Sequence, residues 1–280
     1  MMVILGASGF LGRYLFDRFR QDGLPAVGTY CRHPQPDMIP FELGRTDVKT
    51  LLPHRPSHVL VSAAVHPDPE ATAVHPDEAR EINVNRTRSF IRDCLDLGIV
   101  PVFASTDNVF DGEKGHYSEA DSTNPLNLYG QMKCDVEQTL LESSRPFLLL
   151  RFGKVFRATL GDPALYTNIA AGSRLRLATD QVYTPLFIED LYAFVRDAAA
   201  NGWTGTYHLA SAAATTRYDI AQRAARFLRV ENVNIEPCSI DALGLAARRP
   251  KRIDLDVSKA AALTGRGLRP VEDFLGMVPR

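Results

Sequence analysis

Short apolar runs alternate with longer amphipathic stretches through the first two thirds of the chain. The runs have the length and composition of buried strands, and they cover residues 3–5, 26–29, 38–41, 59–62, 100–104 and 147–152. Between several of them, apolar residues recur at helical spacing, as in 11–21 and 79–97. This alternation predicts an α/β protein with a Rossmann-type, doubly wound parallel sheet.

The last third of the chain is less regular. Strand-like runs occur at 183–188 and 206–209, a helical stretch follows at 219–229, and the chain after Cys238 is punctuated by arginine and proline. We therefore expect an NAD(P)-binding Rossmann domain and a smaller C-terminal substrate-binding lobe. The predicted domain covers 1–157 and 182–210, and the predicted lobe covers 158–181 and 211–280.

The composition is that of an ordinary globular protein with a substantial core. Of 280 residues, 45% are hydrophobic and 23% are charged, and a net charge of -1 gives no field that would attract nucleic acid or an anionic membrane. The four cysteines are far apart and form no CxxC pair, which fits a reducing compartment. No run approaches the length of a membrane span, and the apolar start lacks the basic segment of a signal peptide. We expect a cytoplasmic protein, and assembly as a homodimer stays open.

The first apolar run leads into a glycine-rich segment, "GASGFLG" at 6–12, and then into an amphipathic helix. Glycines at these spacings allow a tight turn, close approach of the backbone to a pyrophosphate, and close packing of helix on strand. The amides at the helix N-terminus would face the anion. The context favours a dinucleotide site over a plain strand-helix turn, with expected contacts from Gly6, Ser8, Gly9, Phe10, Leu11 and Gly12.

The end of the second predicted strand bears on the choice of cofactor. An NAD site usually has Asp or Glu there to accept from the ribose 2′-hydroxyl, whereas this chain has Tyr30-Cys31-Arg32-His33. Arg32 could pair with a 2′-phosphate, and no neighbouring carboxylate in the sequence would repel it. The sequence therefore favours NADPH, with NADH as the alternative.

The sequence "AVHPD" occurs twice, beginning at Ala64 and at Ala73. His66, Asp68, His75 and Asp77 could in principle bind a metal, but each histidine precedes a proline and the pairs lack helical i,i+4 spacing. We interpret both copies as solvated loop and expect no metal site.

Polar residues follow the fifth predicted strand in "ASTDNVFDG" at 104–112. Thr106 would lie at the carboxyl edge of the sheet, where open α/β sheets bind ligands. Further on, Tyr129 and Lys133 are four residues apart, so they would project from one face of a helix. An ammonium near a phenol makes tyrosine a usable proton donor, which predicts a catalytic set of Thr106, Tyr129 and Lys133.

The glycine loop, Thr106 and the Tyr129-x-x-x-Lys133 pair, in this order, resemble an extended short-chain dehydrogenase/reductase. More narrowly, segments over nearly the whole chain are similar to the dTDP-4-dehydrorhamnose reductase group of nucleotide-sugar reductases. These segments are "STDNVFDG", "YSEAD", "PLNLYGQMK", "TDQ", "EDL" and "RRPKRIDLDVSK".

The resemblance implies further roles. Tyr129 and Lys133 would contact the cofactor, with Lys133 on the nicotinamide ribose, and Ala63 and Ala64 would line the cofactor site. The substrate, a nucleotide sugar, would meet residues at a sugar pocket; we expect these to be Thr106, Asp107, Asn108 and Arg249. On physical grounds alone, Arg249 and its neighbour Arg248 could equally be solvent-exposed.

Three departures from the group leave the substrate open. The group usually has tyrosine where this chain has Asn108 and glycine where it has Arg157, and it commonly has a different run where this chain has Val65-His66-Pro67-Asp68. The same signature also resembles the regulatory β subunit of methionine adenosyltransferase, which binds NADP without catalysing a reaction. An epimerase or dehydratase is a third alternative, although the sequence offers only one carboxylate, Asp107, beside Thr106. We favour an NADPH-dependent reductase of a nucleotide-linked 4-keto-6-deoxy sugar.

Overall fold

The computed structural model describes residues 1–157, 163–230, 233–265 and 267–270, which form two compact units. The first unit consists of Met1–Thr106, Leu128–Arg151 and Tyr192–Tyr207, and the second of Asp107–Asn127, Phe152–Leu191 and His208–Arg280. The division into a Rossmann domain and a substrate lobe that the sequence suggests stays a prediction.

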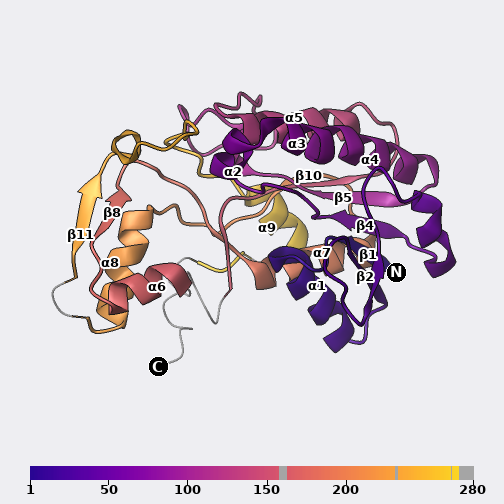
Figure 1. Cartoon of the computed structure of the whole chain (residues 1–280), viewed down its shortest axis with the longest axis horizontal. Helices are drawn as coiled ribbons and strands as arrows, with labels where there is room; N and C mark the ends of the chain where they lie inside the picture. Colours follow the sequence, from indigo (N-terminus) through magenta and orange to yellow (C-terminus); the bar gives the residue numbers. More distant parts are fainter. Residues whose placement is uncertain (158–162, 231–232, 266, 271–280) are drawn as a thin grey trace. The chain divides into compact units, whose positions relative to one another are not determined.

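The largest sheet among the described residues has seven strands in the order β10-β6-β5-β4-β1-β2-β3 (Figure 1). The order reverses direction at β1, as expected for a doubly wound sheet, so the predicted α/β Rossmann-type class is confirmed. The strands are β1 (Met2–Leu5), β2 (Ala26–Tyr30), β3 (Met38–Pro40), β4 (His58–Val61), β5 (Val100–Ala104), β6 (Leu148–Arg151) and β10 (Gly205–His208).

Parallel pairing brings the ends of the central strands to one edge. Leu5 is in register with Val61, and Val61 is in register with Phe103. The strands β1 and β4 are buried on both faces, which explains why they read as continuous apolar runs instead of alternating ones. The segments that follow β1, β4 and β5 therefore emerge together, and they carry the residues that the sequence singles out.

Helices cover both faces of this sheet: α2 to α5 lie on one face, and α1 and α7 on the other (Figure 1). On the first face, Phe90 and Ile91 of α4 and Val136 of α5 share a buried cluster with Val3 and Phe103. The elements are α1 (Phe10–Gln21), the 3₁₀ helix η1 (Val48–His54), α2 (Pro69–Val74), α3 (Pro76–Arg80), the π-helical turn η2 (Glu81–Arg86), α4 (Thr87–Asp96), α5 (Leu128–Leu141) and α7 (Ile188–Asn201).

One local expectation was wrong: the second "AVHPD" copy is not loop, because it spans the end of α2 and the start of α3. The helical stretch predicted over 79–97 is present as the consecutive segments α3, η2 and α4. Pro69 and Pro76 each occupy the first position of a short helix, where a missing N–H costs nothing and a fixed φ helps. The Asp68 side chain caps α2 by accepting from the amide of Ala71 at 2.9 Å.

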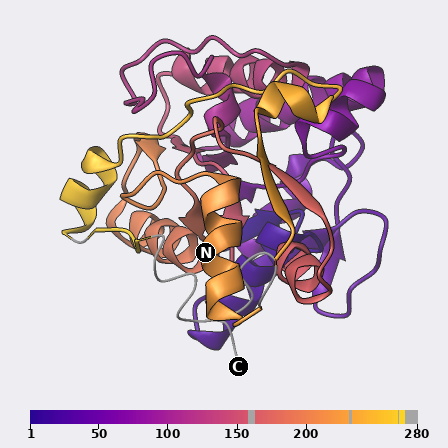
Figure 2. The same cartoon turned by 90° about the vertical axis from the view of Figure 1, so that its left-hand side faces the viewer.

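The second unit contains small strand pairs and helices. Helix α8 contacts α6, β8 and β11, and the turned view in Figure 2 brings α8 to the front. A capping box formed by Thr216 and Asp219 starts α8. The elements are η3 (Asp107–Val109), β7 (Val155–Phe156), α6 (Pro163–Ala170), β8 (Leu175–Ala178), β9 (Leu186–Phe187), α8 (Arg217–Phe227), β11 (Ile235–Cys238), η4 (Ile240–Leu243) and α9 (Ser258–Thr264).

Within the residues that the structure describes, we find no helix with the length and apolar character required to traverse a bilayer.

Candidate functional site

The loop after β1 is packed so closely that it depends on glycine. Gly6 has a φ of 83°, and a Cβ built there would lie 2.8 Å from the backbone of Ala63. The Gly6 amide donates to Thr29 Oγ1 at 3.2 Å, and its carbonyl accepts from the Gly9 amide at 3.0 Å. A Cβ at Gly12 would lie 2.9 Å from Ala7 Cα. Gly6 and Gly12 thus have conformational and packing reasons to be glycine, and the expected approach of this loop to a pyrophosphate stays a prediction.

The N-terminus of α1 is suited to an anion. Its N-cap is Gly9, which provides no side-chain cap, and its first turn carries no acidic residue. The positive end of a helix dipole with open backbone amides favours a phosphate group at this point.

A cavity of about 430 Å³ opens beside this loop. Predicted cofactor residues line it from three strand ends: Gly6, Ser8 and Gly9 after β1, Arg32 after β2, and Ala63 and Ala64 after β4. Its size and its glycine cradle fit part of a dinucleotide. The other three predicted contacts of the loop do not line the cavity: Phe10 is exposed, Leu11 is half-buried and Gly12 is buried.

The segment after β4 forms one wall of the cavity, and Asn83, which the sequence analysis did not single out, holds it in place. Asn83, on the π-helical turn η2, accepts from the Val65 amide at 2.9 Å and donates to the Val65 carbonyl at 2.7 Å. One side chain thereby satisfies both backbone groups of Val65. No local pattern around Asn83 points to a partner eighteen residues earlier.

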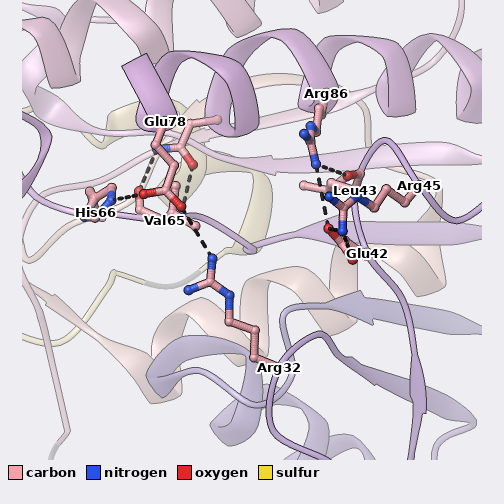
Figure 3. Close-up of polar contacts among 9 residues, drawn as sticks. Arg32, Glu42, Leu43, Arg45, Val65, His66, Glu78 and Arg86 are labelled. Atoms are coloured by element: carbon pink, nitrogen blue, oxygen red, sulfur yellow. Dashed lines mark hydrogen bonds and ion pairs between the residues drawn. The ribbon is translucent and has the colours of Figure 1, made fainter. Parts of the chain in front are cut away.

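Arg32 lies next to a carboxylate, Glu78, that the sequence analysis did not identify as its neighbour. Figure 3 shows its guanidinium directed at Glu78 of α3, with Arg32 Nη2 3.4 Å from Glu78 Oε1. The other Glu78 oxygen lies 2.9 Å from His66 Nε2. His66 also stacks on His75, with ring centroids 4.3 Å apart. The two histidines of the repeat are therefore neighbours, yet within the described part of the chain no three His, Cys, Asp or Glu residues form a metal-binding group.

The predicted catalytic helix exists as α5, and its register is as expected. Tyr129 lies in the first turn and Lys133 one turn later, with the Lys133 ammonium 5.9 Å from the centre of the Tyr129 ring. Lys133 Nζ donates to the carbonyl oxygen of Ala104 at 2.8 Å. Ala104 ends β5, and buried Thr106 follows two residues later. The structure thus brings the lysine to the strand end that carries the threonine.

The Lys133 amine is partly desolvated. Burial lowers the pKa of Lys133 to about 8, and the negative charge of Glu137 opposes this decrease. The ammonium form therefore dominates at neutral pH but is lost under mildly basic conditions.

Glu137 connects α5 to two strands. Its carboxylate accepts from Ser105 Oγ and from Arg151, with Arg151 Nη2 2.7 Å away and Nε at 3.1 and 3.2 Å. The side chains of Arg151 and Glu137 are only 4% and 2% exposed. This buried pair ties α5 to the ends of β5 and β6. The sequence carries a usable signal, because Glu137 is one helical turn after Lys133 and shares its face.

The predicted substrate residues of the second unit lie in and near η3. Asp107 is buried, its amide donates to the Phe152 carbonyl at 3.2 Å, and its carboxylate accepts from Asn108 Nδ2 at 2.9 Å. Asn127, which the sequence did not single out, donates to Asn108 Oδ1 at 3.3 Å and to the Arg248 carbonyl at 3.0 Å. Asn127 therefore links η3 to the "RRP" segment.

The arginines of that segment differ in exposure. Arg248 is exposed and Arg249 is half-buried. Arg157, the other departure from the group pattern, is half-buried in the same unit. Their proposed roles toward a substrate stay predictions.

The sheet, the glycine loop and the adjoining cavity define a Rossmann-type α/β protein with a site that fits a dinucleotide. The sequence matches the RmlD substrate binding domain family over residues 1–278, and the chain belongs to that family. The resemblance to the dTDP-4-dehydrorhamnose reductase group is thereby confirmed.

Relatives of two kinds match most of the chain. Methionine adenosyltransferase 2 subunit beta from Rattus norvegicus is 28% identical over 278 residues, which cover 94% of this chain and 82% of the relative. A probable low-salt glycan biosynthesis reductase, Agl14, from Haloferax volcanii is 29% identical over 284 residues, which cover 97% of this chain and 95% of the relative. Sequence similarity alone therefore extends both to a reductase and to a subunit of another enzyme.

Solved structures agree on the fold. A hypothetical dTDP-4-dehydrorhamnose reductase from Sulfolobus tokodaii superposes with a TM-score of 0.85 and 25% identity, covering 100% of this chain and 99% of the other. The dTDP-4-dehydrorhamnose reductase from Bacillus anthracis, solved in complex with NADP, gives a TM-score of 0.82 at 23% identity. It covers 98% of this chain and 96% of the other.

Proposed function

We propose that the protein is an NADPH-dependent reductase that converts the C4 keto group of a nucleotide-linked 4-keto-6-deoxy sugar to a hydroxyl. The observation that carries the proposal is the hydrogen bond from the Lys133 amine to the carbonyl of Ala104, the last residue of β5. Lys133 is one helical turn after Tyr129 in α5, and Ala104 is two residues before Thr106. Family membership and the reductases among the relatives support the same reaction class.

The roles of the side chains follow from their chemistry. A bound NADPH would supply the hydride and become NADP⁺. Tyr129 donates its phenolic proton to the carbonyl oxygen, and the Lys133 ammonium stabilises the phenolate that remains. The Thr106 hydroxyl donates to the same oxygen and orients the carbonyl. Hydride on C4 and a proton on oxygen together complete the alcohol.

The sugar would be recognised by residues of the second unit. Asp107 and Asn108 present a carboxylate and an amide linked to each other, and Arg249 offers a cation for the diphosphate of a nucleotide sugar. Asn108 replaces the larger ring that is usual in the group, so we expect a hexose with a different substituent pattern next to it.

The test is to mix the purified protein with NADPH and a panel of nucleotide-linked 4-keto sugars and to follow the absorbance of the reduced cofactor. Tyr129→Phe removes the proton donor and should reduce turnover by about 10²-fold or more while NADPH affinity stays within about twofold. Undiminished turnover in Tyr129→Phe would reject this tyrosine as the acid.

The second candidate is a non-catalytic, NADP-binding regulatory subunit. It is favoured by the 28% identity to methionine adenosyltransferase 2 subunit beta across 94% of this chain. Tight cofactor binding with no consumption on any sugar, together with a stable complex with a methionine adenosyltransferase catalytic subunit, would favour this candidate over the reductase. Oxidation of NADPH by any sugar of the panel would exclude a purely regulatory role.

A further inference from the structure

The carboxylate that NAD sites usually carry at the end of the second strand is absent from β2, but Glu42 and Glu78 reach the cavity from other elements. Glu42 pairs with Arg45 and Arg86, whereas Glu78 pairs with Arg32. Glu78 of α3 lines the cofactor cavity together with Arg32, although the two residues are 46 positions apart. Both also line an adjoining cavity of about 420 Å³. Figure 3 shows the Glu78 side chain between Arg32 and His66.

The two contacts of Glu78 are unequal. The contact with His66 is short, at 2.9 Å, and the histidine side chain is only 23% exposed. The contact with Arg32 is long, at 3.4 Å, between side chains that are 69% and 47% exposed. Thr72 Oγ1 donates to the His66 carbonyl at 2.8 Å, and the His75 ring stacks on that of His66, so the histidine is well held. Glu78 is therefore fixed on the His66 side, and Arg32 is the partner that can leave.

The charge state of Glu78 fits this arrangement. The hydrogen bond with His66 and the nearby Arg32 lower the pKa of Glu78, so the carboxylate is ionised at neutral pH. An ionised carboxylate accepts hydrogen bonds from a hydroxyl and repels a phosphate.

We propose that Glu78 is a specificity-determining residue for the cofactor. Its carboxylate competes with the 2′-phosphate of NADPH for Arg32, and it accepts a hydrogen bond from the 2′-hydroxyl of NADH. Both effects reduce the ratio of NADPH affinity to NADH affinity. This inference rests on the cofactor assignment of the proposed function. With NADPH, Arg32 exchanges a carboxylate partner for a phosphate, and the displaced Glu78 charge stays nearby. With NADH, the Arg32–Glu78 pair is retained.

A matched control lies on the next element. Glu81, at the start of η2, lines the adjoining cavity but is bound by Arg86 at 3.0 Å and by Asn85 at 2.9 Å. Glu81→Gln removes the same charge close by without changing a partner of Arg32. A general effect of net charge would appear in both variants, whereas a specific one would appear only in Glu78→Gln.

The experiment measures dissociation constants for NADPH and NADH by titrating the fluorescence of the reduced nicotinamide in wild type, Glu78→Gln, Glu81→Gln, Arg32→Ala and the Arg32→Ala/Glu78→Gln double variant. Glu78→Gln should tighten NADPH by about three- to tenfold, because Arg32 no longer has to give up an exposed carboxylate partner to bind the 2′-phosphate. NADH affinity should stay within about twofold or weaken. Arg32→Ala should weaken NADPH more than NADH and should remove most of the gain from Glu78→Gln.

Three results would overturn the inference. They are equal shifts for NADPH and NADH in Glu78→Gln, the same NADPH gain in Glu81→Gln, and a full gain from Glu78→Gln in the Arg32→Ala background. Each of these leaves the proposed reductase intact. Failure of the wild type to bind either dinucleotide would instead reject the cofactor assignment, and with it both proposals.

Discussion

Replacement of Glu137 by glutamine should destabilise the protein strongly, because it removes the carboxylate charge that pairs with the buried guanidinium of Arg151. Glu137 and Arg151 are 2% and 4% exposed, and their closest atoms are 2.7 Å apart. Glutamine keeps the shape of the side chain and one carbonyl acceptor for Ser105 or Arg151. The variant therefore tests the charge instead of the packing.

The size of the effect follows from the geometry. At an effective dielectric constant of about 20, unit charges at the 2.7 Å separation of this pair attract by about 6 kcal/mol. Structural relaxation and the entry of water around Arg151 reduce the loss of this attraction in the variant. Removal of one partner of a buried pair typically costs about 3–5 kcal/mol of stability. We expect a decrease of that size in the free energy of unfolding.

The assay is urea unfolding followed by circular dichroism. A double variant, Glu137→Met with Arg151→Leu, removes both charges and should recover at least half of the loss, since apolar replacements of buried pairs are often neutral. Asp135→Asn is the control on the same helix: it breaks a partly exposed pair with Arg80 at 3.2 Å and should cost less than about 1 kcal/mol. A cost below about 1 kcal/mol for Glu137→Gln, or a double variant no more stable than the single one, would refute the reasoning.

The remaining predictions concern the glycine loop and Lys133. Because burial lowers the pKa of Lys133 to about 8, the ammonium is lost as the pH rises through that value, and kcat/KM of the proposed reductase should fall above it. Lys133→Arg keeps its positive charge at high pH, so any activity that this variant retains should persist to higher pH. If kcat/KM of Lys133→Arg falls at the same pH as in the wild type, another group is responsible for the decrease. Gly12→Ala places a Cβ 2.9 Å from Ala7 Cα and should weaken NADPH binding by about tenfold or more with the fold retained. Gly267→Ala adds a Cβ in open space and should change nothing measurable; equal affinity in the two variants would contradict the packing role of Gly12.

The sequence predicted the elements whose signals are local. Strand β1 and residues 59–61 of β4 are apolar because both faces are buried, and the glycines at 9 and 12 approach Gly6 and Ala7 within their own loop. The pairing of Tyr129 with Lys133 depends only on the period of one helix. For the same reason the Rossmann-type class and the family resemblance, both read from ordered local motifs, were confirmed.

The sequence could not predict contacts between segments that are distant along the chain. Arg32 was interpreted as an arginine with no carboxylate to repel a phosphate, yet the fold brings Glu78 to within 3.4 Å. The contact exists because α3 starts at Pro76, on a segment that the pattern did not identify as helical. Asn83 was missed for a similar reason, since the π-helical turn that aims it at Val65 leaves no mark in the hydrophobic period.

The clamp of Asn83 on Val65 has a consequence for how fast a dinucleotide can associate. Since both peptide groups of Val65 already have partners, this stretch loses its conformational freedom when the protein folds. Ordering the backbone of one residue costs about 1–2 kcal/mol of free energy, and because Val65 is already ordered, ligand binding does not include this cost. The segment after β4 should therefore bind a dinucleotide without changing its conformation. The association rate should then be set by diffusion and not by rearrangement of this segment.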